Sequence, residues 1–209
     1  YSSAASDVYK RQITTSVIVL CALSKRLVPP ETYPLLVLVI ALFLLFHRSL
    51  MSKFVIGYDV YLEYYFAKLT SINSIWDKTI PHRYNAMLSV TILPVIYSNF
   101  LKLDLDWVFK AVYPLIYSIV PLTLYLAYRR QTSSRIAFLS VFYFMSMELF
   151  YTTMLGLVRQ MIAELFFALL ILLIVEEKIS LHNRKFLFVI FGLALILSHY
   201  GLSYIFMFY

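Results

Sequence analysis

Long runs of apolar residues constrain the fold of this chain more than any other feature of its sequence. A helix needs about 20 mostly apolar residues to cross a lipid bilayer. Runs that approach this length recur along the chain: Pro34 to Leu50, Trp107 to Tyr128, Ile136 to Thr153, Leu157 to Val175 and Phe186 to Tyr200. Hydrophobic residues make up 62% of the 209 positions and charged residues 14%, against roughly 45 to 50% and about 25% in soluble domains. The sequence therefore predicts an all-α, polytopic bundle of transmembrane helices.

The two ends of the chain differ from its middle. Residues 1–12 are polar and do not suit the apolar run that follows, so we expect them to be an artefact of sequencing-linker read-through, outside the fold. Residues 13–50 are expected to form the N-terminal transmembrane helices, of which Ile13 to Leu23 is the remaining half of one span. Residues 107–209 form the main bundle. Because the chain stops inside a new apolar run, we expect it to be a piece of a longer protein.

The basic residues between the apolar runs indicate how the helices are oriented, since short cytoplasmic loops are enriched in Lys and Arg. If the short apolar segment Ala86 to Leu101 does not cross, the basic residues of the short loops share one face: Lys25, Arg26, Arg129, Arg130, Arg135, Lys178, Arg184 and Lys185. Residues 51–106 are then one extracytoplasmic excursion, in which Tyr61 to Leu69 and Ala86 to Leu101 are helices lying along the membrane surface. Orientation in the cell membrane, and not nucleic-acid binding, explains the net charge of +7.

An acidic, aromatic segment opens this excursion, with the sequence Gly57-Tyr58-Asp59-Val60-Tyr61-Leu62-Glu63-Tyr64-Tyr65-Phe66. If the segment is helical, a separation of four residues puts Asp59 and Glu63 on the same face. The pair could then bind a divalent cation, Mg or Mn, or one carboxylate could raise the pKa of the other. A positioned carboxylate also suits a general base. The alternative is an ordinary solvated helix start, with Asp59 as its cap.

Charged residues inside the later spans need partners, because an unpaired charge in a membrane is costly. Arg159 and Glu148 lie equally far from the predicted outer turn around Thr153 and Met154, which predicts an ion pair between them. The functional alternative is that Arg159 binds a phosphate, since guanidinium offers bidentate donors to phosphate oxygens. Glu164 lies deeper in the same span and needs an interior partner or protonation.

Three further residues are candidates for substrate binding on the same predicted side of the membrane. His199 lies beside Tyr200 at the outer end of its span, where it can hold a phosphate or a sugar hydroxyl or serve as a structural hydrogen-bonding group. Trp76 can stack on a sugar ring or anchor the chain at the membrane interface.

Several motifs together resemble a known group of proteins. Gly57-Tyr58-Asp59 with Glu63-Tyr64-Tyr65-Phe66, Tyr84-Asn85-Ala86-Met87-Leu88-Ser89, Phe109-Lys110 through Pro114, and Arg159-Gln160 look like an uncharacterised family of predicted archaeal membrane proteins, and the large first loop resembles the GT-C superfamily of glycosyltransferases. This resemblance implies a polyprenyl-phosphate-linked sugar donor at the outer membrane face and an essential Asp in the first large loop, which corresponds to Asp59. Many members carry Asp-x-Asp or Asp-Glu, and the spacing of Asp59 and Glu63 departs from that pattern.

The leading functional hypothesis is thus an inverting membrane glycosyltransferase with Asp59 and Glu63 as catalytic or metal-binding residues and Arg159, His199, Tyr200 and Trp76 as substrate-binding residues. A membrane transporter or lipid flippase is the alternative, because Pro114, Pro121 and Glu164 can mark a broken helix on a transport path. A non-catalytic multi-pass protein is the third. The sequence contains no Gly-rich phosphate loop, His-Glu-x-x-His motif or Gly-x-Ser-x-Gly motif that would support nucleotide, zinc or serine-hydrolase chemistry.

Overall fold

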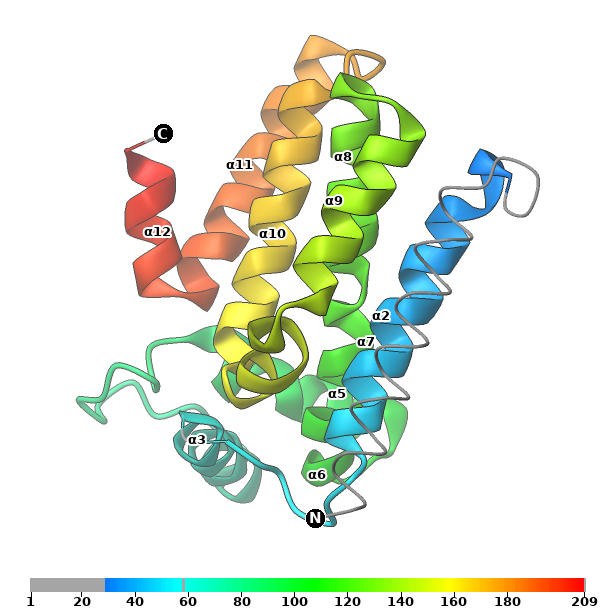
Figure 1. Ribbon diagram of the computed structural model, residues 1–209. Coiled ribbons are helices and arrows are strands. Elements are labelled where there is room, and N and C mark those ends of the chain that lie inside the picture. Colours follow the sequence, from blue (N-terminus) through cyan, green and yellow to red (C-terminus); the bar gives the residue numbers. More distant parts are fainter. Residues whose placement is uncertain (1–28, 58, 209) are drawn as a thin grey trace, which may run out of the picture.

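The computed structural model describes residues 29–57 and 59–208, and all regular structure in these residues is helical. The predicted all-α architecture is confirmed (Figure 1). Four of the described helices are long and apolar enough to cross a membrane: Pro30–Ser49, Leu105–Gln131, Val158–Val175 and Leu181–Ser198. The predictions for residues 1–12 and for the half span Ile13 to Leu23 lie outside the described residues.

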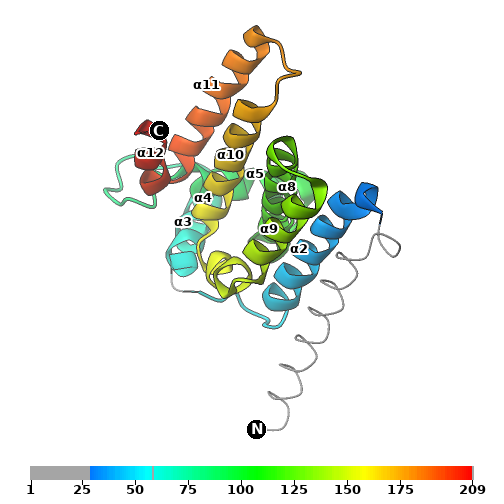
Figure 2. The same cartoon turned by 45° about the horizontal axis from the view of Figure 1, so that its top comes forward.

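The long helices run up and down beside one another in Figure 1. They are α2 (Tyr33–Ser49), α8 (Ile119–Gln131), α9 (Ser134–Ser146), α10 (Val158–Val175) and α11 (Leu181–Ser198), followed by the shorter α12 (Tyr200–Met207). Helix α10 packs against both α8 and α11, and α9 packs against α8. Figures 1 and 2 both place α2 and α12 at opposite edges of the bundle.

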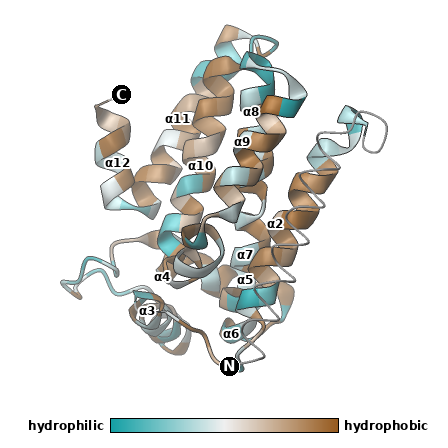
Figure 3. Ribbon diagram, in the orientation of Figure 1, coloured by the Kyte–Doolittle hydropathy of each residue, from teal (hydrophilic) through white to brown (hydrophobic). Residues whose placement is uncertain are grey.

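Burial along α2 follows the helical period. Tyr33, Val37, Ala41 and Leu45 are completely buried, and they recur every fourth residue on the face that meets the bundle. Leu35, Val39 and Phe43 on the other side are exposed. In Figure 3 most of the ribbon of α2 and of α11 has the hydrophobic colour. Apolar side chains on both faces are what a helix between protein and lipid requires.

Shorter helices lie across the lower end of the bundle in Figure 1. Helix α3 (Asp59–Asn73) contains the predicted helix Tyr61 to Leu69, and the predicted helix Ala86 to Leu101 is divided into α4 (Leu88–Thr91) and α5 (Leu93–Leu101). The existence of these helices is confirmed, and their position along a membrane surface stays a prediction. The last short helix, α6 (Leu105–Trp107), leads into the second long span.

A proline interrupts the helical hydrogen bonds of the span Leu105–Gln131. Pro114 lies in the first turn of α7 (Tyr113–Tyr117), and its missing N–H leaves the Lys110 carbonyl without its usual helical donor. The chain widens here into a π-helical turn, Val108–Val112, and the Ser49 hydroxyl donates to the Lys110 carbonyl at 2.5 Å. This irregular turn is thereby tied to the end of α2.

The predicted span Ile136 to Thr153 corresponds to two helical segments separated by a bend, and not to one continuous helix. Helix α9 ends at Ser146, Met147 is extended, and the following segment Leu149–Gly156 is bent by 59° from α9. The Ser146 hydroxyl donates to the Tyr143 carbonyl, a local side-chain bond of the kind that competes with regular helix. The next helices are close to their predicted positions, although α11 begins at Leu181 and not at Phe186 because the Ser180 hydroxyl accepts from the Asn183 N–H.

The basic turns lie at the opposite end of the bundle from α3. Arg129 and Arg130 close α8, Lys178 lies in the connection from α10 to α11, and Arg184 lies in the first turn of α11. The ends of these helices are at the top of Figure 1. Within the described residues, the predicted grouping of the short basic loops at one end is confirmed. Glu176 accepts a hydrogen bond from Arg130 in this cluster.

Candidate functional site

A glycine brings the acidic segment into contact with the turn before α10. Gly57 has a φ of +148°, a conformation that L side chains rarely adopt. A Cβ at this position would lie 2.5 Å from the Cα of Gly156. The two backbones can therefore approach only because residue 57 has no side chain. Asp59, two residues later, is the first residue of α3.

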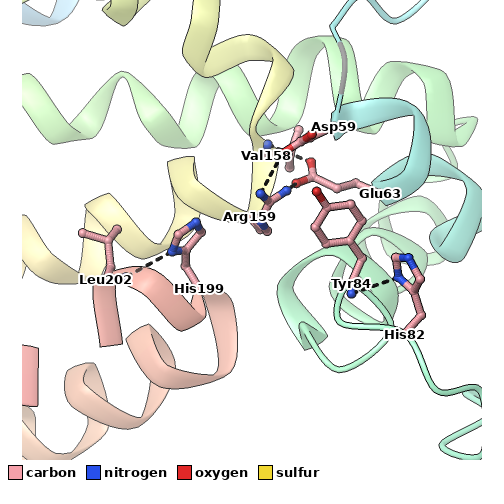
Figure 4. Close-up of polar contacts among 8 residues, drawn as sticks. All are labelled: Asp59, Glu63, His82, Tyr84, Val158, Arg159, His199 and Leu202. Atoms are coloured by element: carbon pink, nitrogen blue, oxygen red, sulfur yellow. Dashed lines mark hydrogen bonds and ion pairs between the residues drawn. The ribbon is translucent and has the colours of Figure 1, made fainter. Parts of the chain in front are cut away.

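Asp59 and Glu63 share one face of α3, as predicted, and both bind Arg159 of α10. The Arg159 guanidinium donates from Nη2 to Asp59 Oδ2 at 2.8 Å and from Nη1 to Glu63 Oε1 at 2.5 Å. Figure 4 shows the two carboxylates converging on this one guanidinium. The acidic segment and the start of α10 are thus joined by two charge-assisted hydrogen bonds.

Glu63 is the most deeply buried member of the cluster. Its side chain is 0% exposed, and its second oxygen accepts from the backbone N–H of Val158 at 2.8 Å. Because Val158 is the first residue of α10 and no side chain caps that helix locally, Glu63 satisfies one of the free N–H groups of its first turn. Burial raises the pKa of Glu63 to about 7, against the opposing attraction of Arg159.

Asp59 is more accessible and more acidic than Glu63. One third of its side chain is exposed, at 33%. Partial burial raises its pKa, but hydrogen bonds with Arg159 and Tyr84 and the charges of Arg159 and Arg83 outweigh burial, so the pKa lies below its ordinary value. The two carboxylates therefore have different roles: Glu63 is a buried structural group, and Asp59 is an accessible, ionised one.

An aromatic residue without a predicted role completes the cluster. The Tyr84 ring lies 4.3 Å from the Arg159 guanidinium carbon and 5.1 Å from that of Arg83. Its backbone N–H donates to Nδ1 of His82, which is drawn beside it in Figure 4. A cation held against an aromatic face is stabilised as well as oriented. No spacing rule connects Tyr84 with Arg159, although Tyr84 opens one of the motifs of the family resemblance.

The predicted ion pair between Arg159 and Glu148 is wrong. Arg159 binds Asp59 and Glu63, and Glu148 is exposed. The prediction assumed a symmetric turn between two straight antiparallel helices, whereas the bent segment Leu149–Gly156 follows Glu148. Equal sequence distance from the turn therefore does not give equal depth.

His199 lies near the cluster but does not bind its carboxylates. It precedes α12, and its Nδ1 accepts from the Leu202 N–H at 3.1 Å, so a neutral ring carries its proton on Nε2. Burial lowers its pKa, and the charge of Arg159 lowers it further. Tyr200 stacks on the His199 ring at 5.2 Å. Neither side chain lines the cavity beside Asp59, and their role in substrate binding stays a prediction.

Trp76 has a structural partner in the loop that precedes α4. Its indole N–H donates to the Asn85 backbone carbonyl at 3.0 Å, and Asn85 in turn donates to the carbonyls of Asp77 and Ile80. Asn85 is adjacent to Tyr84, so this network supports the loop that places Tyr84 over Arg159.

The cluster does not fit the predicted divalent cation. Arg159 already occupies oxygens of both Asp59 and Glu63, and the second Glu63 oxygen binds the Val158 N–H. No group of three His, Cys, Asp or Glu side chains elsewhere in the described residues is arranged to hold a metal. A guanidinium takes the place that a cation would need between these carboxylates.

A cavity of about 470 Å³ lies beside Asp59. Its walls come from the end of α2, the segment before α3, the π-helical turn and the turn before α10. The lining residues are Arg48, Ser49, Val55, Ile56, Gly57, Asp59, Phe109, Lys110, Thr152, Thr153, Leu155, Gly156 and Leu157. It combines a carboxylate with two cationic side chains and several apolar ones, and of these only Asp59 was predicted as a site residue.

Glu164 finds its partners inside the bundle. Tyr117 Oη donates to Glu164 Oε2 at 2.9 Å, and Gln160 Nε2 donates to Oε1 at 2.9 Å. The expectation of an interior partner for Glu164 is confirmed. The partners are hydrogen-bond donors and not a counter-charge.

No protein-family model, curated protein or solved structure matches this chain. Within residues 29–57 and 59–208 the fold is all-helical, with several helices that can cross a membrane and, at one end of them, a charged cluster whose Asp59 lines a cavity. The resemblance to GT-C glycosyltransferases stays a prediction.

Proposed function

We propose that this chain is an integral membrane glycosyltransferase of GT-C type, which transfers a sugar from a polyprenyl-phosphate-linked donor at the outer face of the cell membrane. The observation that carries the proposal is Asp59, an accessible carboxylate that lines a cavity at one end of a bundle of apolar helices. Its lowered pKa keeps it ionised at neutral pH, which is the form that a general base requires. A lipid-linked donor can reach such a cavity from the bilayer.

The distribution of basic residues supports the proposed orientation. The turns that carry Arg129, Arg130, Lys178 and Arg184 lie at the end of the bundle opposite to α3. Cytoplasmic loops carry the excess of Lys and Arg in membrane proteins. The cavity would then open towards the extracytoplasmic side, where polyprenyl-phosphate-linked sugars are used by GT-C enzymes.

The proposed reaction uses Asp59 as the base. Its carboxylate accepts the proton of the acceptor hydroxyl while the hydroxyl oxygen forms a bond to the anomeric carbon of the sugar. The bond from that carbon to the phosphate oxygen breaks, and the phosphate leaves with the electron pair, which inverts the anomeric configuration. A positioned base typically contributes about 10² to 10⁴ in rate. Arg159 and Glu63 are positioning residues, since they hold Asp59 without lining the cavity.

The experiment compares two carboxylate substitutions in membranes that contain the protein. Asp59→Asn should abolish transfer of a radiolabelled hexose from its polyprenyl-phosphate carrier, while membrane insertion and the amount of folded protein remain unchanged. Asp104→Asn is the matched control, because Asp104 is an exposed carboxylate in the same excursion that does not line the cavity. Transfer by Asp59→Asn at the wild-type rate would overturn the assignment.

A transporter or flippase is the second candidate, and the broken helices favour it. The 59° bend before α10 and the π-helical turn at Val108–Val112 interrupt two membrane-spanning segments, and interrupted helices often form transport sites. Reconstituted vesicles distinguish the two functions: a transporter moves a labelled lipid or solute across the bilayer without a change in its covalent structure, whereas the enzyme produces a new glycoside.

A further inference from the structure

Lys110 is a buried cation inside a span that can cross a membrane. Lys110 is only 9% exposed. Its Nζ donates to the backbone carbonyls of Ser52 at 2.6 Å and Lys53 at 3.3 Å. No carboxylate forms an ion pair with it in the part of the chain that the structure describes. The carbonyls and the Trp107 ring, whose centre lies 5.4 Å from Nζ, stabilise this charge without neutralising it, so the ammonium can still attract an anion.

Arg48 provides a second cation in the same cavity. It lies in the last turn of α2, and its guanidinium makes no hydrogen bond or ion pair with other described residues. Both Arg48 and Lys110 line the cavity beside Asp59. Guanidinium and ammonium groups bind phosphate through charge-assisted hydrogen bonds.

The charges around the cavity favour an anion. Arg48 and Lys110 contribute two positive charges, and Asp59 contributes one negative charge. Arg159 and Glu63 offset each other behind this wall. The lining therefore has a net charge of +1 before a ligand binds, and Thr152 and Thr153 add hydroxyl groups to it.

The apolar part of the lining indicates what the anion is attached to. Val55, Ile56, Phe109, Leu155 and Leu157 line the same cavity. A free inorganic anion gains nothing from these side chains, whereas a phosphate on a hydrocarbon chain can place each of its parts against a matching surface.

We propose that Lys110 and Arg48 form a phosphate-binding subsite for an amphiphile with a phosphate headgroup, next to Asp59. In this proposal the phosphate is bound by Lys110 and Arg48 and not by Arg159, because the Arg159 guanidinium is already bound to two carboxylates. The inference rests on the proposed function only for the orientation of the ligand towards Asp59. Binding itself does not require that any sugar be transferred.

The test measures the affinity of the detergent-solubilised full chain for farnesyl phosphate, which has one phosphate and a short isoprenoid chain. Lys110→Met and Arg48→Met should each weaken binding by about tenfold or more, the effect expected for loss of one hydrogen bond to a charged group. Lys53→Met is the matched control, because Lys53 is a cation of the neighbouring loop that does not line the cavity. It should change the affinity by less than about twofold.

Arg48→Met keeps the proposal testable if Lys110→Met does not fold, since the Arg48 guanidinium makes no polar contact with the rest of the described chain that the substitution would remove. Farnesol and inorganic phosphate are the two comparison ligands. Weak binding of both supports a phosphate-headed amphiphile. Equal binding of farnesol or of inorganic phosphate would overturn the amphiphile assignment, and unchanged affinity in both cavity variants would overturn the subsite.

Asp59→Asn separates this inference from the proposed function. The variant should bind farnesyl phosphate at least as tightly as the wild type, because it removes a negative charge from the cavity, while sugar transfer is lost. Binding that depends on Arg48 without any transfer refutes only the glycosyltransferase. Transfer that depends on Asp59, with farnesyl phosphate affinity unaffected by Arg48→Met and Lys110→Met, refutes only the subsite.

Discussion

Replacing Arg159 should strongly destabilise the fold, because its carboxylate partner cannot reach water. In Arg159→Met the completely buried Glu63 keeps the Val158 N–H but loses the guanidinium. Above about pH 8, where Glu63 with its pKa of about 7 is ionised, removing one partner of such a buried ion pair typically costs about 3 to 5 kcal/mol in the free energy of unfolding. Since about 1 kcal/mol shifts the unfolding midpoint by about 2 to 4 °C in a chain of this size, we expect a decrease of about 6 to 20 °C.

The double variant Glu63→Met with Arg159→Met gives the magnitude a second, independent check. Replacing both members of a buried pair by apolar side chains of similar size is often close to neutral. Asp59 also loses Arg159, but its side chain is 33% exposed and water can hydrate it. The double variant should therefore be more stable than Arg159→Met alone. The difference measures the coupling between the two side chains.

Thermal unfolding in mild detergent micelles, followed by circular dichroism, provides the measurement. Arg130→Met is the matched control, because Arg130 is 43% exposed and pairs with Glu176 at the surface; its loss should cost less than about 1 kcal/mol. An Arg159→Met protein that unfolds at the wild-type temperature, or a double variant as unstable as the sum of the single ones, would refute the reasoning.

Three further predictions follow from individual contacts. Burial raises the pKa of Glu63 from 4.5 to about 7. The stability that Glu63 contributes is therefore full below its unfolded pKa and is lost as pH rises through about 7. Relative to Glu63→Gln, the unfolding temperature of the wild type should decrease between about pH 5 and about pH 8, and an increase of that temperature would contradict the prediction. The comparison with Glu63→Gln removes the opposite contribution of His199, whose lowered pKa favours the fold at higher pH. Gly57→Ala should cost more than about 1 kcal/mol in the same unfolding assay, because of its positive φ and the contact with Gly156. Tyr117→Phe should cost about 1 to 3 kcal/mol by leaving Glu164 Oε2 without its Tyr117 donor. Tyr125→Phe should cost little, because the buried hydroxyl that it removes has no hydrogen-bond partner among the described residues. Equal losses would contradict this explanation.

The helices, and the face of α3 that Asp59 and Glu63 share, could be predicted from the sequence because both depend on local geometry. An apolar run of about 20 residues is long enough for a helix to cross a bilayer, and its length and hydropathy can be read from the sequence. The shared face of Asp59 and Glu63 follows from the 3.6-residue turn alone. The bend after Ser146 was missed, because the hydropathy of Ile136 to Thr153 is the same for a straight helix and a broken one.

The partners within the site were decided by the tertiary structure. Asp59 and Arg159 are 100 positions apart, and their contact depends on the close approach of Gly57 to Gly156 and on the bent segment before α10. Lys110 carried a signal, as a single charge in an apolar span, but its place in a cavity depends on Pro114, which frees a carbonyl, and on Ser49, which binds that carbonyl from 61 positions away. Hydrogen bonding within a helix is local and can be predicted from sequence, whereas the choice of counter-ion between distant helices depends on which side chains packing brings to the same depth.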